Sequence, residues 1–251
     1  MNRQLYLECY SGISGDMTVA ALLDLGADEQ ILRKALASLP VGGFEIAVTR
    51  KVKSGLDVCD FDVILDAEHE NHDHDMEYLH GHDHQHIHDH DHSHEHVHED
   101  GSVHTHEHHH HAHSHEHHHD HGHHHEHRGL HEILHIIEQA DMTERAKETA
   151  VRIFRILAEA ESKAHGVPAD QVHFHEVGAV DSIVDILAVA VCLDNLDITE
   201  VIVPFLCEGQ GSIRCQHGII PVPVPAVVNI AQAHGLTLKP TGVQGELVTP
   251  T

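Results

Sequence analysis

One segment constrains the fold of this chain more than any other. Between residues 69 and 127, 29 of 59 residues are histidine, 14 are aspartate or glutamate, and none is lysine or arginine. A segment with so few apolar side chains cannot offset the roughly 1–2 kcal/mol per residue that ordering a backbone costs in entropy. We therefore predict that residues 69–127 are disordered without metal. Because lengthening a loop costs only about 0.6 kcal/mol per doubling, residues 1–68 and 128–251 can still form one domain.

This histidine tract also predicts metal binding. Neutral imidazole binds borderline divalent ions, with an affinity that rises along the first-row series toward nickel and copper, although zinc and cobalt share the preference. The alternative is an acidic solubilising segment or a purification tag, but the tract is internal and its histidines alternate with Asp, Glu and Ser. Binding should weaken below about pH 6, where imidazole takes up a proton. The candidate ligands in the densest runs are His108, His109, His110, His111, His117, His118, His119, His123, His124 and His125.

Charge and composition exclude several classes of partner. The chain has 14 basic and 41 acidic side chains and a formal net charge of -27, which repels a nucleic-acid backbone and an anionic membrane surface. The longest apolar run, residues 186–193, is far shorter than the roughly 20 residues of a membrane span. The five cysteines are scattered without a CxxC pair, and no secretion signal is evident. We expect a cytoplasmic protein with free thiols.

Apolar periodicity outside the tract predicts both helices and strands. We therefore predict an α+β fold, that is, a mixed α/β single domain interrupted by a disordered histidine-rich insert. The predicted strands cover residues 5–9, 44–48, 58–65 and 201–205, and those at 44–48 and 58–65 are expected to form a hairpin with its turn near Gly55. Residues 172–177 are predicted as a short strand or an extended loop. The predicted helices cover residues 17–25, 31–39, 130–137, 143–165, 181–193 and 225–233.

One short motif resembles a zinc protease signature. His131, Glu132 and His135 match HExxH, in which two histidines one helical turn apart hold zinc and the glutamate activates water. The match begins just beyond a stretch that is half histidine, so it can easily arise by chance, and no third ligand is identified. We favour the alternative that both histidines lie on the exposed side of an amphipathic helix.

A second group of residues can form a metal or acid–base site. In an extended segment, His173 and His175 point to the same side, and Glu176 follows them directly. Asp181 and Asp185 are one helical turn apart and share a face of the next helix. The alternative is that Asp181 caps the helix while Asp185 and both histidines lie on the surface. Spacing alone does not choose between these two interpretations.

The first strand is followed by a glycine turn that can approach a ligand closely. The turn contains Ser11, Gly12, Ser14, Gly15 and Asp16, and it leads into a helix whose free N–H groups can hold an anion. Asp16 would repel a phosphate unless a metal lay between them. The alternative is a plain strand-to-helix turn that Asp16 caps.

Near the end of the chain, residues 209–218 and the prolines after them suggest a rigid loop that presents the Cys215 thiol and the His217 imidazole. These two groups can bind a soft metal. Alternatively, they line a packed turn.

Four motifs, taken together, resemble one family. The set is similar to the family that inserts nickel into pyridinium-3,5-bisthiocarboxylate mononucleotide, with a histidine-rich insert in the usual place. Glu8 stands where such proteins often carry aspartate. The family usually continues beyond the fourth motif into a nucleotide-binding domain. The motifs are YSGISGDM at residues 10–17, HFHEVGAVDS at 173–182, HGIIPVP at 217–223 and GELVTPT at 245–251.

The resemblance implies a reaction and a set of site residues. The family places Ni(II) between two thiocarboxylates of a pyridinium mononucleotide, which forms nickel–sulfur bonds and a nickel–carbon bond and consumes CTP, with Mg(II) or Mn(II) expected. The product is the nickel-pincer cofactor of lactate racemase. The reaction needs a base for the ring proton. The implied catalytic residues are His173, His175, Glu176 and Asp181, and the implied binding residues are Ser11, Gly12, Ser14, Gly15, Asp16 and His217.

The same resemblance implies partners. We expect the mononucleotide substrate, a C-terminal domain polypeptide or a longer product of the same gene, and the lactate racemase apoprotein. The competing interpretation is a nickel store or metallochaperone without enzymatic activity, which would need only the histidine tract and a docking surface.

Overall fold

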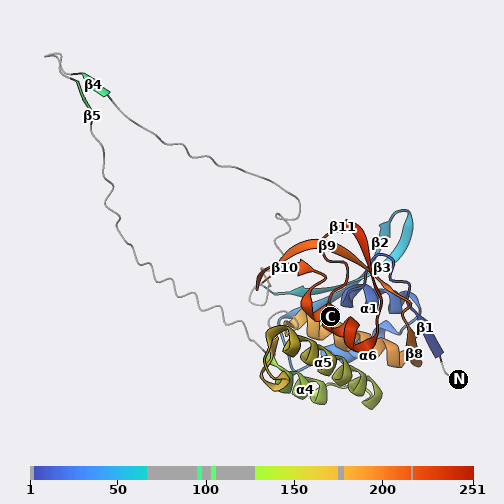
Figure 1. The fold of residues 1–251 in the computed structure, drawn as a ribbon. Coiled ribbons are helices and arrows are strands. Elements are labelled where there is room, and N and C mark those ends of the chain that lie inside the picture. The colour runs from blue at the N-terminus through green and yellow to red at the C-terminus, as the bar shows by residue number, and fades with distance from the viewer. Residues whose placement is uncertain (1–2, 67–94, 98–102, 106–127, 175–177, 216) are drawn as a thin grey trace. The chain divides into compact units, whose positions relative to one another are not determined.

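The computed structural model describes residues 3–66, 95–97, 103–105, 128–174, 178–215 and 217–251 (Figure 1). The chain divides into two compact units, one made of residues 1–75 and 125–251 and the other of residues 76–124. The described part of the second unit is an antiparallel pair, β4 (Glu95–Val97) and β5 (Val103–Thr105). The first unit confirms the predicted mixed α/β fold. The predicted disorder and metal binding of the histidine tract concern residues that lie almost entirely outside the described ones.

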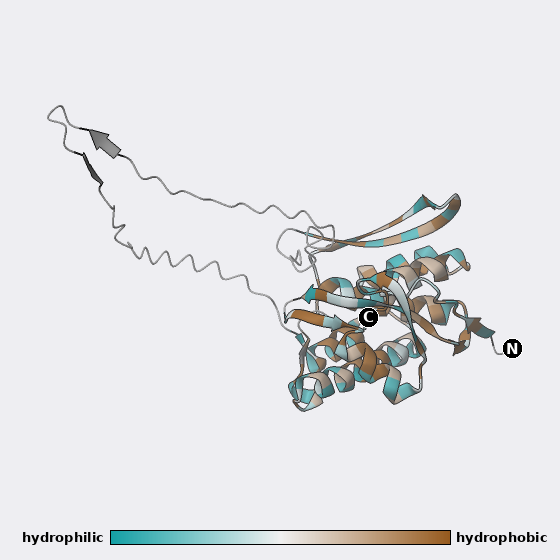
Figure 2. Cartoon of the chain, turned by 45° about the horizontal axis from the view of Figure 1, so that its top comes forward, coloured by the Kyte–Doolittle hydropathy of each residue, from teal (hydrophilic) through white to brown (hydrophobic). Residues whose placement is uncertain are grey.

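The N-terminal part contains two helices and a hairpin, as predicted. Helix α1 (Gly15–Asp24) is followed by α2 (Glu29–Ala37), whose cap is Asp28; this carboxylate accepts first-turn backbone N–H groups at 2.8 and 3.3 Å. Strands β2 (Phe44–Lys53) and β3 (Leu56–Leu65) then pair antiparallel across a two-residue turn. Polar and apolar residues alternate along this hairpin in Figure 2, as expected for a sheet with one face toward the core.

Four α-helices follow the histidine tract in the described part of the chain, all at predicted positions, and the first three of them belong to the core. Helix α4 (Leu130–Gln139) precedes α5 (Glu144–His165), which Thr143 caps and which ends at Gly166 in the left-handed conformation. Helix α6 (Val180–Asn195) has apolar residues nearly all around it, and it packs against α1, α2 and α5. It therefore forms the centre of the core. The largest fully buried apolar side chains of this core include Phe154, Leu22, Leu32, Leu36, Ile133, Ile137, Leu157, Ile183 and Leu187.

A parallel strand pair brings the start of the chain next to the segment that follows α6. Strand β1 (Arg3–Tyr6) pairs with β8 (Ile198–Ile202), which directly follows α6. The predicted strand at residues 201–205 is therefore placed too late in the sequence. Pro204 has no N–H group to donate to a strand pair, which explains why pairing stops before it.

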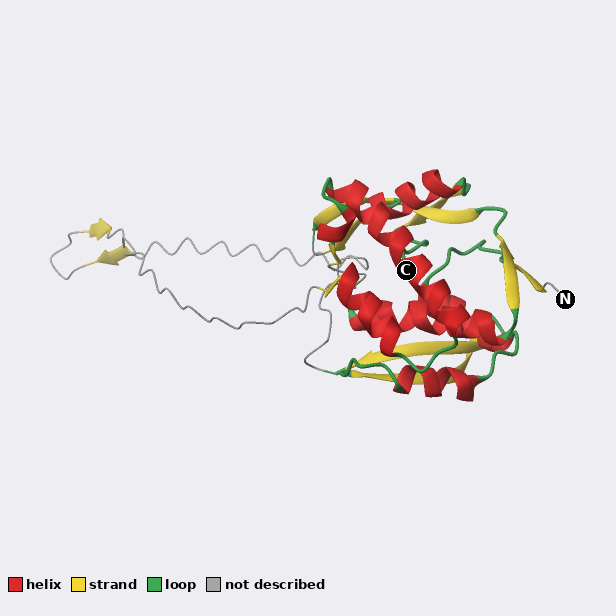
Figure 3. Cartoon of the chain, turned by 90° about the horizontal axis from the view of Figure 1, so that it is seen from below, coloured by secondary structure: helices red, strands yellow, loops and turns green. Residues whose placement is uncertain are grey.

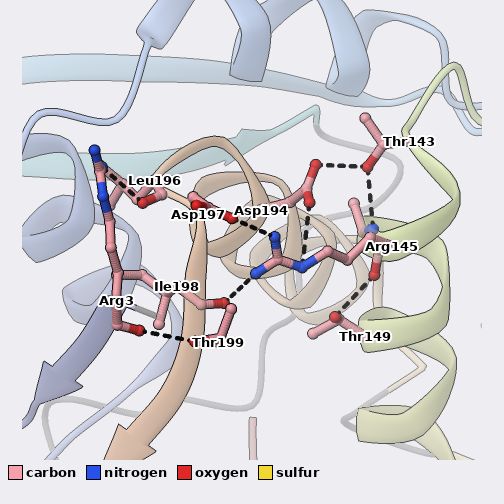
Figure 4. A network of polar contacts seen from close by, with 10 residues as sticks. Arg3, Thr143, Arg145, Thr149, Asp194, Leu196, Asp197, Ile198 and Thr199 are labelled. Atoms are coloured by element: carbon pink, nitrogen blue, oxygen red, sulfur yellow. Dashed lines mark hydrogen bonds and ion pairs between the residues drawn. The ribbon is translucent and has the colours of Figure 1, made fainter. Parts of the chain in front are cut away.

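Polar contacts fasten α5 to the segment after α6 (Figure 4). The Arg145 guanidinium lies 3.5 Å from Asp194 and 2.9 Å from Asp197, and it also donates to a backbone carbonyl at the start of β8. The Thr143 hydroxyl donates to Asp194 at 2.6 Å, and Arg3 donates to the carbonyl of Leu196 at 3.0 Å. These contacts fix the end of α6 relative to β1 and α5.

The last part of the unit is a small sheet, which the sequence did not predict. Strand β9 (Leu206–Cys215) lies between β10 (Gly218–Val222), which is antiparallel to it, and β11 (Leu238–Gln244), which is parallel. Helix α7 (Pro225–His234) connects β10 to β11 and packs against α5. The prediction of a rigid loop at residues 209–218 is thus wrong, because residues 209–215 belong to β9 and Gly218 begins β10, which pairs with it.

Shorter elements complete the unit. The 3-10 turn η1 (Ala169–Gln171) leads into β7 (His173–Phe174), which pairs antiparallel with β6 (Arg128–Gly129). Figure 3 shows the end marked C among the helices and the end marked N at the edge of the unit. Within the described residues, no helix combines the length and apolarity that crossing a membrane requires.

Candidate functional site

A cavity of about 360 Å³ lies where several elements of the first unit end. Its walls are the last turn of α5, the first turn of α6, the β9–β10 turn, the first turn of α7 and the last residues of the chain. The lining residues are Glu161, Ala164, His165, Asp181, Ser182, Ile213, Arg214, Cys215, His217, Ile220, Val224, Pro225, Ala226, Glu246, Thr249, Pro250 and Thr251.

The cavity brings together residues from three of the four sequence motifs. Asp181 comes from the second motif, His217 from the third, and Glu246 with residues 249–251 from the fourth. These residues are far apart in the sequence, so only the fold makes them neighbours. Asp181 and His217 were both predicted as site residues, and the structure places them around the same cavity.

A thiol, two imidazoles and a carboxylate lie on one wall of this cavity. The Sγ atom of Cys215 lies 3.8 Å from Nδ1 of His217, and the ring centroids of His217 and His165 are 4.9 Å apart. Nε2 of His165 lies 3.4 Å from a carboxylate oxygen of Glu161. His165 and Glu161 were not predicted. Both lie in the last turns of α5, where a histidine is usually explained by the helix dipole.

This group by itself is not a complete metal site. In the part of the chain that the structure describes, no three His, Cys, Asp or Glu side chains converge closely enough to hold an ion. Any metal held here would therefore need further ligands from another molecule or a small movement of the side chains. A site that shares its ligands with a second molecule suits metal transfer better than permanent storage.

Two helix N termini also face the cavity. Helices α6 and α7 both begin without a side-chain cap, because their cap residues are Ala179 and Val224. The first N–H groups of a helix need partners, and the helix dipole favours an anion at this end. With Arg214 on the wall, the cavity can accept a molecule that carries phosphate or thiocarboxylate groups.

A second carboxylate lies beneath Asp181. Burial, followed by the negative charges of Asp16 and Asp181, raises the pKa of Asp185 from 3.8 to about 7, although the backbone N–H of Asp16 donates to it. One of its carboxylate oxygens is buried and has no hydrogen-bond partner among the described residues. The alternative interpretation of Asp185 as an exposed surface residue is therefore wrong.

Asp185 makes the stability of the fold depend on pH. Its pKa of about 7 in the folded protein exceeds the ordinary 3.8. The protonated side chain therefore makes its full contribution to the free energy of unfolding below about pH 4, and this contribution is lost as pH rises through 7. Between these limits the free energy of unfolding changes by roughly 4 kcal/mol. Asp185→Asn should be more stable than the parent at pH 8, and this gap should narrow by roughly 3 kcal/mol at pH 5. Urea unfolding at both pH values measures the gap; an equal gap at both would contradict the assignment.

The glycine turn between β1 and α1 packs against the other motifs. A Cβ atom on Gly12, whose φ is +89°, would lie 1.9 Å from the Leu247 carbonyl, and one on Gly15 would lie 2.7 Å from Asp185. The backbone of Ile13 exchanges hydrogen bonds of 2.8 and 3.1 Å with the fourth motif. The turn therefore holds the fourth motif and α6 together.

The polar residues of this turn do not line the cavity. Ser14 is the cap residue of α1, but its hydroxyl donates to the Asp16 carboxylate and does not accept a backbone N–H of the helix. Asp16 lies in the first turn of α1, so it does not cap that helix. A binding role for Ser11, Gly12, Ser14, Gly15 and Asp16 stays a prediction.

A buried glutamate, which the sequence did not single out, holds the fourth motif from the other side. Glu208 in β9 is 1% exposed, and its Oε1 atom accepts the N–H groups of Gly209 at 2.7 Å, Leu247 at 2.8 Å and Val248 at 3.2 Å. Its Oε2 atom is buried without a hydrogen-bond partner among the described residues. Glu208 thus positions the segment that lines the cavity.

The remaining predicted residues lie elsewhere or outside the described residues. His173 belongs to β7, where its backbone pairs with β6. His175, Glu176 and the ten histidines predicted as metal ligands lie outside the described residues. Their roles stay predictions.

The HExxH match belongs to an exposed helix face. His131 and His135 are exposed on α4, and the Glu132 carboxylate accepts the N–H of Gly129 at the start of the helix. The interpretation as an amphipathic helix is confirmed, and Glu132 is engaged in capping.

Comparisons with known proteins identify the family. The sequence profile of the family described as nickel insertion protein matches residues 5–251. A pyridinium-3,5-bisthiocarboxylic acid mononucleotide nickel insertion protein from Alkaliphilus metalliredigens is 49% identical over all of this chain and 51% of its own length. Proteins with the same name are 42% identical in Clostridium acetobutylicum, over 99% of this chain and 54% of their own, and 36% identical in Acetivibrio thermocellus, over 99% and 50%. No solved structure matches.

This chain belongs to the nickel insertion protein family. It spans about half the length of the curated relatives that it matches. The resemblance predicted from the four motifs is confirmed.

Proposed function

We propose that this chain supplies the nickel-loading and nickel-inserting part of an enzyme that converts pyridinium-3,5-bisthiocarboxylic acid mononucleotide into the nickel-pincer cofactor of lactate racemase. The names of its relatives give the substrate. The observation that carries the proposal is the cavity, which gathers three family motifs around a carboxylate, a thiol and two imidazoles.

Asp181 is the proposed base. Metallation of the pyridinium ring replaces one carbon–hydrogen bond with a carbon–nickel bond, so one proton must leave, and a carboxylate on the cavity wall can take it. The two thiocarboxylates of the substrate would supply sulfur ligands to the same nickel ion. The uncapped N termini of α6 and α7 can then hold the phosphate of the mononucleotide. His173, His175 and Glu176, from the same motif as Asp181, are proposed to lie nearby.

The complete enzyme needs further components. We propose that CTP, with Mg(II) or Mn(II), binds the part of the longer relatives that this chain does not span. That part is either a separate polypeptide or the continuation of the same gene product. The proposed setting is the cytoplasm, and the finished cofactor would pass to the lactate racemase apoprotein.

The histidine tract is proposed to store nickel and raise its local concentration. A tract of this kind would also serve a nickel store or metallochaperone without enzymatic activity. The cavity favours the enzyme, because storage alone does not require a carboxylate, a thiol and two helix N termini around one cavity.

The test is nickel transfer to the purified mononucleotide, followed by the absorbance change of the pyridinium ring. The chain is assayed alone and with the C-terminal half of a relative added in trans, each with CTP and Mg(II) or Mn(II). We expect turnover only when both parts are present. Tight nickel binding without turnover in either mixture would instead support a storage or delivery protein.

A further inference from the structure

We propose that Cys215, His217 and His165 form an acceptor site for Ni(II) on the cavity wall, distinct from the histidine tract. The proposal deepens the proposed function and rests on it for one role, the presentation of nickel to the mononucleotide. Nickel binding itself does not depend on that role. The site would receive the ion from the tract and hold it until the thiocarboxylates of the substrate take over.

The positions of the donor atoms support a shared ion. Atoms that bind one metal at about 2.0–2.3 Å lie roughly 3–4 Å from one another. The 3.8 Å between Sγ of Cys215 and Nδ1 of His217 fits this separation. The ring of His165, 4.9 Å from that of His217 between centroids, can supply a third donor after a small rotation.

Glu161 has a supporting position behind His165. Its carboxylate lies 3.4 Å from Nε2 of His165 on the preceding turn of α5. A carboxylate at one ring nitrogen fixes the orientation of an imidazole and increases the basicity of the other nitrogen. In His165 the other nitrogen is Nδ1, and we assign the metal to this atom.

The ligand chemistry favours nickel over the hard cations. Thiolate and imidazole are soft and borderline donors that suit nickel, copper and zinc, whereas magnesium and calcium prefer oxygen. As the nickel–sulfur bond forms, the thiol proton of Cys215 passes to solvent, so acid should weaken binding. Two or three protein ligands leave coordination positions open, and the two thiocarboxylate sulfurs of the substrate can fill them.

Cys215 has a position that the other cysteines lack. Among the described residues it is the one cysteine that lines the cavity. Cys9 and Cys192 are 5% and 1% exposed and lie within the two apolar clusters. Cys207 is partly buried like Cys215 and lies on the same strand, which makes it a matched control.

The experiment is titration of the full chain with Ni(II) alone, monitored by the near-ultraviolet charge-transfer band of a nickel–thiolate bond. Histidine ligands do not give this band, so the tract does not obscure it when nickel is saturating. We expect the band in the parent and in Cys207→Ser, and we expect its loss in Cys215→Ser. Because His217→Ala keeps the thiol, it should retain the band. The nickel concentration needed to reach half of the full band should rise at least about tenfold.

Three outcomes would overturn the proposal. These are the absence of the band in the parent, its persistence in Cys215→Ser, and an unchanged titration in His217→Ala. Circular dichroism of each variant shows whether it has folded, and the His217→Ala result decides the question if Cys215→Ser does not fold. Because neither substrate nor nucleotide is present, the result is independent of whether the proposed reaction occurs.

Discussion

Asp181→Asn is expected to abolish most of the nickel-insertion activity while nickel still binds. Asparagine has nearly the same shape as aspartate but cannot accept the proton that must leave the pyridinium ring. Loss of a positioned general base typically lowers turnover by roughly 10²–10⁴-fold. The measurement is the rate of cofactor formation with the C-terminal half and CTP present, alongside the nickel–thiolate band without substrate. We expect the rate to fall and the band to remain.

Two neighbouring variants separate base catalysis from cavity shape. Ser182→Ala changes the adjacent residue on the same wall and should reduce the rate by less than tenfold. Asp181→Glu keeps a carboxylate and should restore part of the activity that Asp181→Asn loses. If Asp181→Glu and Asp181→Asn are equally inactive, or if Ser182→Ala is as damaging as Asp181→Asn, the role of base would have to be assigned to another residue.

Local signals were enough to predict most of the helical core. Asp28 and Thr143 are side chains that cap helices, and Gly166 ends α5 in a conformation that glycine adopts readily. These features act within one helical turn, so they can be recognised without knowledge of the fold. The same holds for the β2–β3 hairpin, where Ser54 and Gly55 both have positive φ.

The sheet near the end of the chain depends on contacts between distant residues. Gly209 suggested a loop, yet a Cβ atom there would lie 1.8 Å from the carbonyl of Gly245. Glycine is needed in β9 because another part of the backbone passes so close to it. Pro240 is tolerated in β11 because this strand lies at the edge of the sheet, where proline need not donate to a neighbouring strand.

In the candidate site, too, some residues were recognisable from local motifs and others only from contacts between distant parts of the chain. Asp181 and His217 belong to motifs, and sequence reasoning found both. His165 is separated from His217 by 52 positions, and no pattern connects them before α5 and the β9–β10 turn meet. The sequence therefore pointed to two residues of the cavity wall, whereas the full set of side chains around the cavity required the structure.

Glu208→Ala is expected to cause the largest loss of stability among single substitutions near the cavity. Alanine leaves the N–H groups of Gly209, Leu247 and Val248 without their common acceptor in a site that is 1% exposed. Each buried group without a partner costs roughly 1–3 kcal/mol, and removal of one side of a buried polar network typically costs 3–5 kcal/mol in total. Urea unfolding at pH 7 measures this loss in the free energy of unfolding.

Glu208→Gln is the matched control, because its amide oxygen can accept the same three N–H groups. Its NH₂ group would take the place of the Oε2 atom, which has no hydrogen-bond partner among the described residues, so a loss of only about 1–2 kcal/mol is expected. Equal losses in the alanine and glutamine variants would mean that the charge of Glu208, and not its acceptor oxygen, holds the segment. Since Glu246 and residues 249–251 line the cavity, the alanine variant should also lose insertion activity at temperatures where it is still folded.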